Sequence, residues 1–206
     1  MMNDHLISDD LIKKAEEFVR KSFEKDASGH DFFHIQRVVL NAKKICRTEQ
    51  ADEQLVMLAA WLHDVGDYKL HNGIDRSEEL ITGLLKKENA DNLIIEKVVK
   101  IVSEVSFSKG NKPGSIEAKI VQDADRLDAI GAIGIARCFA YGGSSGNLIY
   151  NPDNLSKNSS SIQHFYDKLL ILKNLMNTET ARSIADKRHQ FMELYLEEFY
   201  SEVVEH

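Results

Sequence analysis

Apolar residues recur every three or four positions along most of this chain, the spacing that places them on one face of an α-helix. The first such helix is expected to begin after Ser8, whose hydroxyl can cap it. Others are expected over about Ser77 to Lys87 and after Asp91, which can cap the next helix. Two last helices are expected over 162–176 and 178–204. The pattern predicts an all-α fold.

The last of these helices carries several large apolar residues that we expect to form its packing stripe. They are Ala181, Ile184, Ala185, Phe191, Leu194, Tyr195 and Phe199. The 206 residues hold only two prolines and eleven glycines, so few positions interrupt a helix. With 43% hydrophobic residues, the chain can bury one substantial core or two modest ones.

The formal net charge of -7 argues against a nucleic acid polymer as the main partner, although a small phosphate compound stays compatible with it. Cys46 and Cys138 belong to no CxxC pair. We expect both cysteines to be small core residues of a protein in a reducing compartment. No apolar run reaches membrane-spanning length, and Met1–His5 has no basic, signal-like character. We therefore expect no membrane association and a cytoplasmic location.

A histidine and an aspartate stand next to each other where one apolar helix ends. The run from Leu55 to Leu62 is strongly apolar, His63 and Asp64 follow it, and Gly66 is a common helix stop. Imidazole and carboxylate are ordinary ligands of divalent first-row metals. The alternative interpretation is a plain helix C-terminus with a favourable histidine and a solvated aspartate.

A second histidine lies on the inward face of the preceding helix. His34 shares helical spacing with Val38, Ala42 and Ile45. It is either a hydrogen-bonded core residue or a ligand, and His30-Asp31 before it could form a turn and an N-cap. Antiparallel packing of two consecutive helices would bring His34 and the His63-Asp64 pair together.

Further carboxylates lie in an apolar setting in the second half of the chain. Asp123, Asp125 and Asp128, with Arg126, are interleaved with apolar or small residues, and we expect one buried helix to run through them as far as Tyr141. The glycine-rich stretch 142–146 is expected to end that helix. Buried carboxylates need a cationic partner, which a metal ion would supply.

With His34, His63-Asp64 and Asp125 in this order, the chain resembles the HD superfamily of metal-dependent phosphohydrolases, and more closely a small bacterial group of HD hydrolases. The likeness extends over nearly the whole chain. The motifs that carry it are Gly29-His30-Asp31 with His34, Arg37-Val38, the run 63–67, the run 121–137, the run 139–143 and the run 185–192.

The resemblance implies one helical domain over 1–206, with an HD core at about 28–130 and a C-terminal helical layer at about 131–206. It implies four metal ligands, His34, His63, Asp64 and Asp125. Asp125 is chosen because the family's Ala-Asp-Arg-Leu sequence matches 124–127. Asp67 stands where related enzymes carry a catalytic acid, usually glutamate, so we expect Asp67 and Asp64 to act in catalysis.

Such a ligand set suits one divalent metal ion, with Mn²⁺ favoured over Mg²⁺, Co²⁺, Ni²⁺, Fe²⁺ or Zn²⁺. Basic residues near the motifs are candidates for binding substrate phosphate, although a structural ion pair explains each equally well. They are His30, Arg37, Lys69 and Arg126, with Lys109 and Lys112 in a stretch, 106–115, that is either a basic lid or a plain surface connection.

We therefore expect a metal-dependent phosphohydrolase that cleaves a phosphoester or pyrophosphate bond of a nucleotide or similar small compound. One alternative is a non-catalytic metal- or nucleotide-sensing domain. Another is a two-iron oxygenase, but the lack of histidine between Asn72 and Gln122 disfavours the oxygenase. A homodimer is compatible with the sequence. Structural roles are expected first for His164, Arg188 and His189, and the roles of Asp123 and Asp128 stay open.

Overall fold

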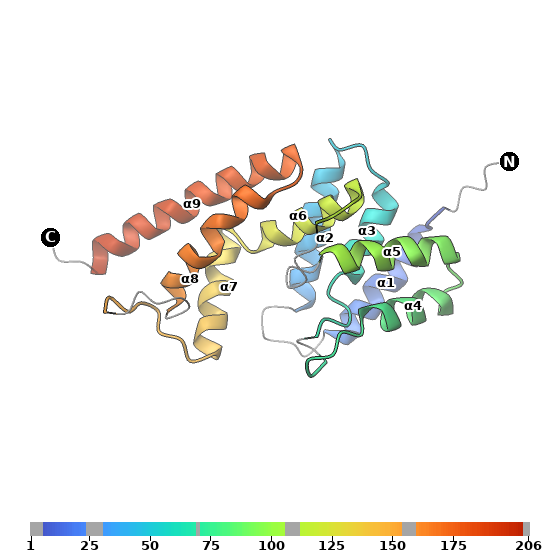
Figure 1. Cartoon of the computed structure of the whole chain (residues 1–206), viewed down its shortest axis with the longest axis horizontal. Helices are drawn as coiled ribbons and strands as arrows, with labels where there is room; N and C mark the ends of the chain where they lie inside the picture. Colours follow the sequence, from blue (N-terminus) through green and yellow to red (C-terminus); the bar gives the residue numbers. More distant parts are fainter. Residues whose placement is uncertain (1–5, 24–30, 69–70, 106–111, 154–159, 204–206) are drawn as a thin grey trace. The chain divides into compact units, whose positions relative to one another are not determined.

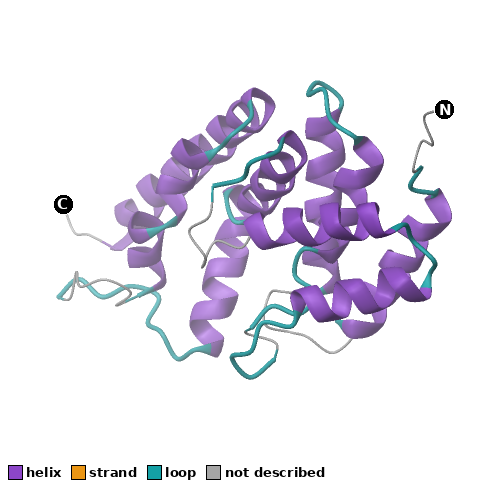
Figure 2. Cartoon of the chain, turned by 45° about the vertical axis from the view of Figure 1, so that its right-hand side comes forward, coloured by secondary structure: helices purple, strands orange, loops and turns teal. Residues whose placement is uncertain are grey.

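The computed structural model describes residues 6–23, 31–68, 71–105, 112–153 and 160–203. Within these ranges all secondary-structure elements are helices (Figure 2), apart from one isolated β-bridge between Leu148 and Ser160. The predicted all-α fold is confirmed. The elements are α1 (Asp9–Ser22), α2 (Phe32–Cys46), α3 (Glu53–Leu62), α4 (Ser77–Lys87), α5 (Asn92–Val105), α6 (Ile116–Asp128), α7 (Gly131–Ser144), α8 (Ser161–Asp167), the 3-10 helix η2 (Leu169–Leu175) and α9 (Glu179–Val203).

The chain divides into two compact units, the first over residues 1–124 and the second over 125–206. The boundary falls inside α6, so one continuous helix belongs to both units. None of the described helices is both long enough and apolar enough to cross a bilayer.

In the first unit α3 is the central helix. All eight residues from Leu55 to Leu62 are buried, and α3 contacts α1, α2 and α5, while α4 packs on α5 (Figure 1). A helix without a polar face can be stable only when neighbours surround it. The His63-Asp64 pair at its end is therefore held by the most buried element of this unit.

Side-chain caps fix where three of these helices begin. Ser8, Asp31 and Asp52 each accept a hydrogen bond from the backbone N–H three residues later, at 3.2, 2.7 and 3.0 Å. Asp91 accepts one from Leu93 N–H at 2.7 Å. These bonds satisfy donors that helix starts leave open, and they confirm the predicted starts after Ser8 and Asp91.

In the second unit α7 packs on α8 and α9, and η2 packs on the same two helices. The expected continuous helix from the acidic stretch to Tyr141 is wrong, because α6 ends at Asp128 and α7 begins at Gly131. The chain turns there through two backbone hydrogen bonds that each span three residues. Ala129 N–H donates to the Arg126 carbonyl, and Ile130 N–H donates to the Leu127 carbonyl. Gly131 has φ +75°, which L side chains rarely adopt.

The helix α7 is also less buried than expected, since Gly131, Gly134, Ile135 and Gly142 are its only buried residues. It ends at Ser144, within the glycine-rich stretch predicted to stop it.

The expected helix over 162–176 is instead the short α8 followed by the 3-10 helix η2. The apolar residues Leu169, Leu172 and Met176 are buried, and the first two are three positions apart, which matches the three-residue turn of a 3-10 helix. The α-helical spacing that we assumed is therefore wrong for this segment.

The packing stripe of α9 is also only partly as predicted. Ala181 and Ala185 are buried as expected, but Phe191 and Leu194 are 50% and 60% exposed. The other buried positions of this helix are His189, Met192 and Leu196. A polar histidine thus takes a core position, whereas the phenylalanine two residues later, which was predicted to pack, faces away from the core.

Candidate metal centre

His34 lies in the first turn of α2, where the cap on Asp31 fixes the backbone. The carboxylate of Asp31 accepts the His34 backbone N–H at 2.7 Å, so the helix begins just before the histidine. The His34 side chain is 1% exposed and lies on the face that also buries Ile35 and Val38. The capped start therefore holds an imidazole inside the first unit rather than at its surface.

His63 is the C-cap of α3, and its ring is oriented by the backbone of its own helix. The Nδ1 atom lies 2.8 Å from the carbonyl oxygen of Ala60. A carbonyl oxygen can only accept, so Nδ1 carries the proton and the lone pair of the neutral ring is on Nε2. Histidine ligands of metals are commonly oriented by such a bond from the other ring nitrogen.

Asp64 lies between the two imidazoles. Its Oδ2 atom is 3.4 Å from Nε2 of His34, and its Oδ1 atom is 3.5 Å from Nε2 of His63. The two rings are 5.5 Å apart between centroids and are inclined at 66°. Both Nε2 atoms thus face the same carboxylate.

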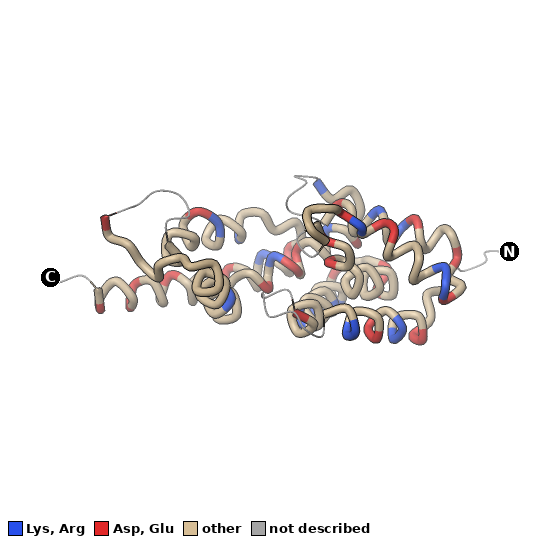
Figure 3. Tube along the Cα trace, turned by 90° about the horizontal axis from the view of Figure 1, so that it is seen from below, with Lys and Arg blue, Asp and Glu red and all other residues tan. Residues whose placement is uncertain are grey.

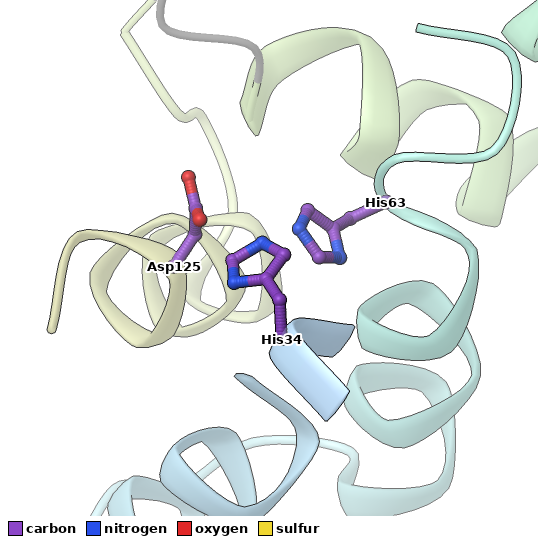
Figure 4. A group of neighbouring side chains, drawn as sticks. All are labelled: His34, His63 and Asp125. Carbon is purple, nitrogen blue, oxygen red and sulfur yellow. The ribbon is translucent and has the colours of Figure 1, made fainter. Parts of the chain in front are cut away.

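Asp125, in the last turn of α6, completes the group (Figure 4). One ligand atom from each of His34, His63 and Asp125 lies within 4.8 Å of the other two. The three side chains come from the ends of α2, α3 and α6 and point toward one another. The two histidines are buried and Asp125 is half-buried.

This donor set fits a divalent first-row metal ion. Imidazole nitrogen and carboxylate oxygen bind such ions at about 2.0–2.2 Å, which places neighbouring donors about 3.0–3.4 Å apart in octahedral or tetrahedral geometry. The His34–Asp64 and His63–Asp64 separations of 3.4 and 3.5 Å are close to that range. The donors of His34, His63 and Asp125, which lie within 4.8 Å of one another, would draw closer together around a bound ion.

The predicted catalytic residue Asp67 follows three residues after Asp64. Its backbone N–H donates to the Asp64 carbonyl at 3.1 Å, and its side chain is half-buried. The loop closes where Arg76 N–H donates to the Gly66 carbonyl at 2.9 Å. Asp67 therefore lies next to the hydrogen bond that closes this loop, three residues after Asp64.

Two of the four predicted phosphate-binding residues, Arg37 and Arg126, lie within the described residues. Arg37 is half-buried on α2, one turn beyond His34. Nη1 of Arg126 donates to the Leu175 carbonyl in the second unit. His30, Lys69 and Lys109 lie outside the described residues, and Lys112 is exposed.

Asp128 in the acidic stretch, and Arg188 and His189 on α9, make contacts with other residues of the chain. Asp128 is 2% exposed, and its Oδ2 atom is 2.8 Å from Nη1 of Arg137. Nη1 of Arg188 donates to the Leu127 carbonyl, and burial lowers the pKa of Arg188 although the charge of Asp128 opposes that shift. His189 Nε2 is 3.1 Å from Glu193. These contacts favour the structural roles expected for Arg188 and His189.

Sequence reasoning missed one buried polar residue near this centre. Asn41 on α2 donates from Nδ2 to the carbonyl oxygen of Ala124, the residue before Asp125, at 3.2 Å. The only signal in the sequence was an amide seven positions after His34, on a face that is otherwise apolar.

Comparison with known proteins identifies the family. A sequence model described as "HD domain" matches residues 31–130. An HD-superfamily hydrolase from Bacillus thuringiensis has a crystal structure that superposes with a TM-score of 0.80 at 41% identity, covering 94% of this chain and 96% of that one. The chain belongs to the HD superfamily. The matched region includes all four predicted ligands and Asp67, and it begins one residue after His30.

Other relatives are similar to this chain over most of their length. The uncharacterized protein YpgQ of Bacillus subtilis is 42% identical over 193 residues, which cover 88% of this chain and 89% of YpgQ. A crystal structure of YpgQ in complex with ADP has a TM-score of 0.80 and covers 93% of this chain and 97% of that one. A Lactobacillus plantarum protein has a TM-score of 0.83 at 34% identity, covering 96% and 98%.

Proposed function

We propose that this HD protein is a metal-dependent phosphohydrolase that cleaves a phosphoester or pyrophosphate bond in a nucleotide or a related small phosphate compound. The observation that carries the proposal is the convergence of His34, His63 and Asp125 donors within 4.8 Å, with Asp64 between the two imidazoles. His34, His63, Asp64 and Asp125 would hold one divalent ion. Mn²⁺ is the ion that we favour among the first-row metals and Mg²⁺.

A divalent ion bound there would lower the pKa of a water molecule and polarise a phosphoryl oxygen. The chain prepares the site in two ways. The His63–Ala60 bond presents the Nε2 lone pair, and Asp64 places a carboxylate beside both imidazoles. Asp67, directly after this pair, is the proposed group that takes or delivers a proton at the reacting phosphate.

Recognition of the substrate phosphate is assigned to nearby basic side chains. His30, Arg37, Lys69 and Arg126 are the proposed contacts, each acting through a positive charge or an N–H donor. Acidic and basic residues are interspersed along the described trace (Figure 3), and the whole chain carries -7. Local cations, rather than the overall charge, would therefore have to attract a phosphate compound.

The B. subtilis relative supports a nucleotide as the ligand class, because YpgQ has been crystallised with ADP. That complex is compatible with hydrolysis and also with nucleotide sensing without catalysis. An isolated domain that only senses would keep the ligand set but release no product.

The test is phosphate and pyrophosphate release from a panel of nucleoside mono-, di- and triphosphates with Mn²⁺, Mg²⁺, Co²⁺ or Ni²⁺. Parent protein, Asp64→Ala, Asp67→Asn and the exposed control Asp186→Ala are compared. We expect turnover by the parent and the control, and a loss of at least about 100-fold in kcat/KM for Asp64→Ala. Asp67→Asn should lower kcat while metal affinity is kept.

Equal inactivity of the parent and Asp64→Ala on every nucleotide would contradict hydrolysis. Metal-dependent nucleotide binding by the inactive parent would then favour the sensing domain instead. Equilibrium dialysis with ADP, with and without Mn²⁺, measures that binding directly.

A further inference from the structure

Asn41 forms a buried bond between two helices that carry predicted metal ligands. Its side chain is 8% exposed, and Nδ2 lies 3.2 Å from the carbonyl oxygen of Ala124, 83 residues away in sequence. Both residues belong to the first unit. The bond therefore joins α2 to α6 inside one compact body.

The position is unfavourable for a polar group unless the hydrogen bond is made. Val38, Ala42 and Ile45 on the same helix are completely buried. Burying an amide without a partner costs about 1–3 kcal/mol in proteins, whereas an apolar residue would bury its surface favourably. A specific bond at this point of α2 thus needs a reason beyond filling the core.

The reason that the geometry offers is the placement of two ligands. Asn41 follows His34 by seven residues, about two helical turns, so the two side chains lie on one face of α2. The Ala124 carbonyl belongs to the peptide group that leads into Asp125. One face of α2 thus presents an imidazole and also binds the backbone next to a carboxylate ligand.

We propose that Asn41 is a positioning residue for the metal centre, which fixes the α6 backbone at Asp125 relative to His34. The proposal rests on the proposed function, because it assumes that His34 and Asp125 bind one ion. Metal–ligand distances are met within about 0.2 Å in real sites, so a slight shift of α6 along α2 weakens binding.

Gln122 offers a matched control for a purely structural bond. It lies on α6 one turn before Asp125, is 3% exposed, and its Nε2 atom donates to the Glu104 carbonyl at 3.2 Å. This bond has the same chemistry and length as the Asn41 bond, and both amide side chains are buried. It joins α6 to α5, which carries no predicted ligand.

The experiment measures Mn²⁺ binding to metal-free parent, Asn41→Leu, Asn41→Asp and Gln122→Met by isothermal titration calorimetry. Thermal unfolding of the metal-free proteins is followed in parallel, and binding is measured well below every unfolding midpoint. We expect both apolar substitutions to lower the midpoint by similar amounts. The Mn²⁺ dissociation constant should rise about 10-fold or more for Asn41→Leu and less than about 2-fold for Gln122→Met.

Asn41→Asp keeps the size of the side chain but places an oxygen against the Ala124 carbonyl oxygen, so it should weaken Mn²⁺ binding as well. It decides the matter if Asn41→Leu does not fold. Unchanged Mn²⁺ affinity in a folded Asn41 variant, or an equal loss in Gln122→Met, would overturn the positioning role and leave the proposed function intact. Absence of Mn²⁺ binding by the parent would overturn both.

Discussion

Oδ2 of Asp64 lies 3.4 Å from Nε2 of His34, although the two residues come from different helices. The His34 ring is almost completely buried, and the Asp64 side chain is 16% exposed. A carboxylate that is largely shielded from water is stabilised by a cation or by hydrogen bonds. A divalent cation bound between Asp64 and His34 would therefore stabilise this region.

Metal removal should consequently destabilise the protein. A ligand that binds only the folded state, at 100 times its dissociation constant, adds about 2.7 kcal/mol to the free energy of unfolding. For a chain of this length that corresponds to a midpoint rise of about 5–10 °C. We expect Mn²⁺ to raise the parent's unfolding midpoint by such an amount and EDTA to reverse it, as followed by circular dichroism.

Asp64→Asn should abolish the Mn²⁺-dependent rise, because it removes the charge but keeps the side-chain shape. Asp186→Asn, an exposed acid on α9, should keep the full rise. A metal-independent midpoint in the parent, or an undiminished rise in Asp64→Asn, would contradict the predicted ligand role of Asp64.

Gly66 and Gly73 offer a controlled comparison in the loop after the histidine–aspartate pair. Both have φ +87°. A Cβ atom at Gly66 would lie 2.4 Å from the backbone nitrogen of Ser77, whereas a Cβ at Gly73 would have no neighbour within 4 Å. The two positions share this positive φ and differ in the space available to a Cβ atom.

Gly73→Ala should therefore lower the free energy of unfolding by about 1–2 kcal/mol, the cost of a left-handed conformation. Gly66→Ala should lower it by a further 1–3 kcal/mol or so, because backbone atoms must move to admit the methyl group. Urea denaturation measures both. Gly66→Ala should also weaken Mn²⁺ binding, since the loop adjoins Asp64, and equal stability of the two variants would refute the steric argument.

Much of the fold followed from local sequence signals. The predicted helix from Ser77 to Lys87 has those bounds in the structure, and the Ser8 and Asp91 caps are as expected. Such features depend on a few neighbouring residues. The break at Gly131 was missed because helical spacing does not reveal the positive φ of this glycine or the close approach of Arg188, whose Cβ and Cγ atoms would lie 3.0 Å from an added Cβ.

In the candidate site too, some features followed from neighbouring residues and others did not. His63-Asp64 was singled out from its position at the end of an apolar run, but Asp125 was preferred over its acidic neighbours only through family resemblance. In the structure Asp128 pairs with Arg137, whereas Asp125 joins the two histidines. Neighbouring acids on one helix differ in role according to distant partners, which helical spacing does not specify.

Both cysteines should react slowly with alkylating agents in the folded protein. Burial, followed by the charges of Glu53 and Glu117, raises the pKa of Cys46 to about 11, and burial raises the pKa of Cys138 to about 11. The thiolate is the reactive form, and at pH 8 about one thiol in a thousand with this pKa is ionised.

We expect iodoacetamide to modify both cysteines at least about 100-fold more slowly than an exposed thiol of pKa near 8.5. A raised pKa depletes the thiolate at neutral pH, so the rate should increase about tenfold per pH unit between pH 7 and 10. Mass spectrometry of quenched samples gives the rates, and urea-unfolded protein is the control. Equal rates in native and unfolded protein would show that the thiols are not protected.

Asp128 and Arg137 form a buried ion pair whose breakage should be more harmful on one side than on the other. Asp128 is 2% exposed and Arg137 is 22% exposed. Loss of Arg137 removes the cation that pairs with the buried Asp128 carboxylate. Loss of the Asp128 charge instead leaves a guanidinium that can reach water. Removing one partner of a buried pair typically costs about 3–5 kcal/mol.

Arg137→Met should therefore lower the free energy of unfolding by about 3 kcal/mol, and Asp128→Asn by less. The double variant should resemble Asp128→Asn, which gives a coupling energy above about 1 kcal/mol in a double-mutant cycle by urea denaturation. The exposed Arg76–Glu79 pair is the control. Its nitrogen–oxygen distance of 2.6 Å is shorter, yet its coupling should be much smaller because solvent screens it. Additive effects at Asp128 and Arg137 would show that burial does not strengthen this pair.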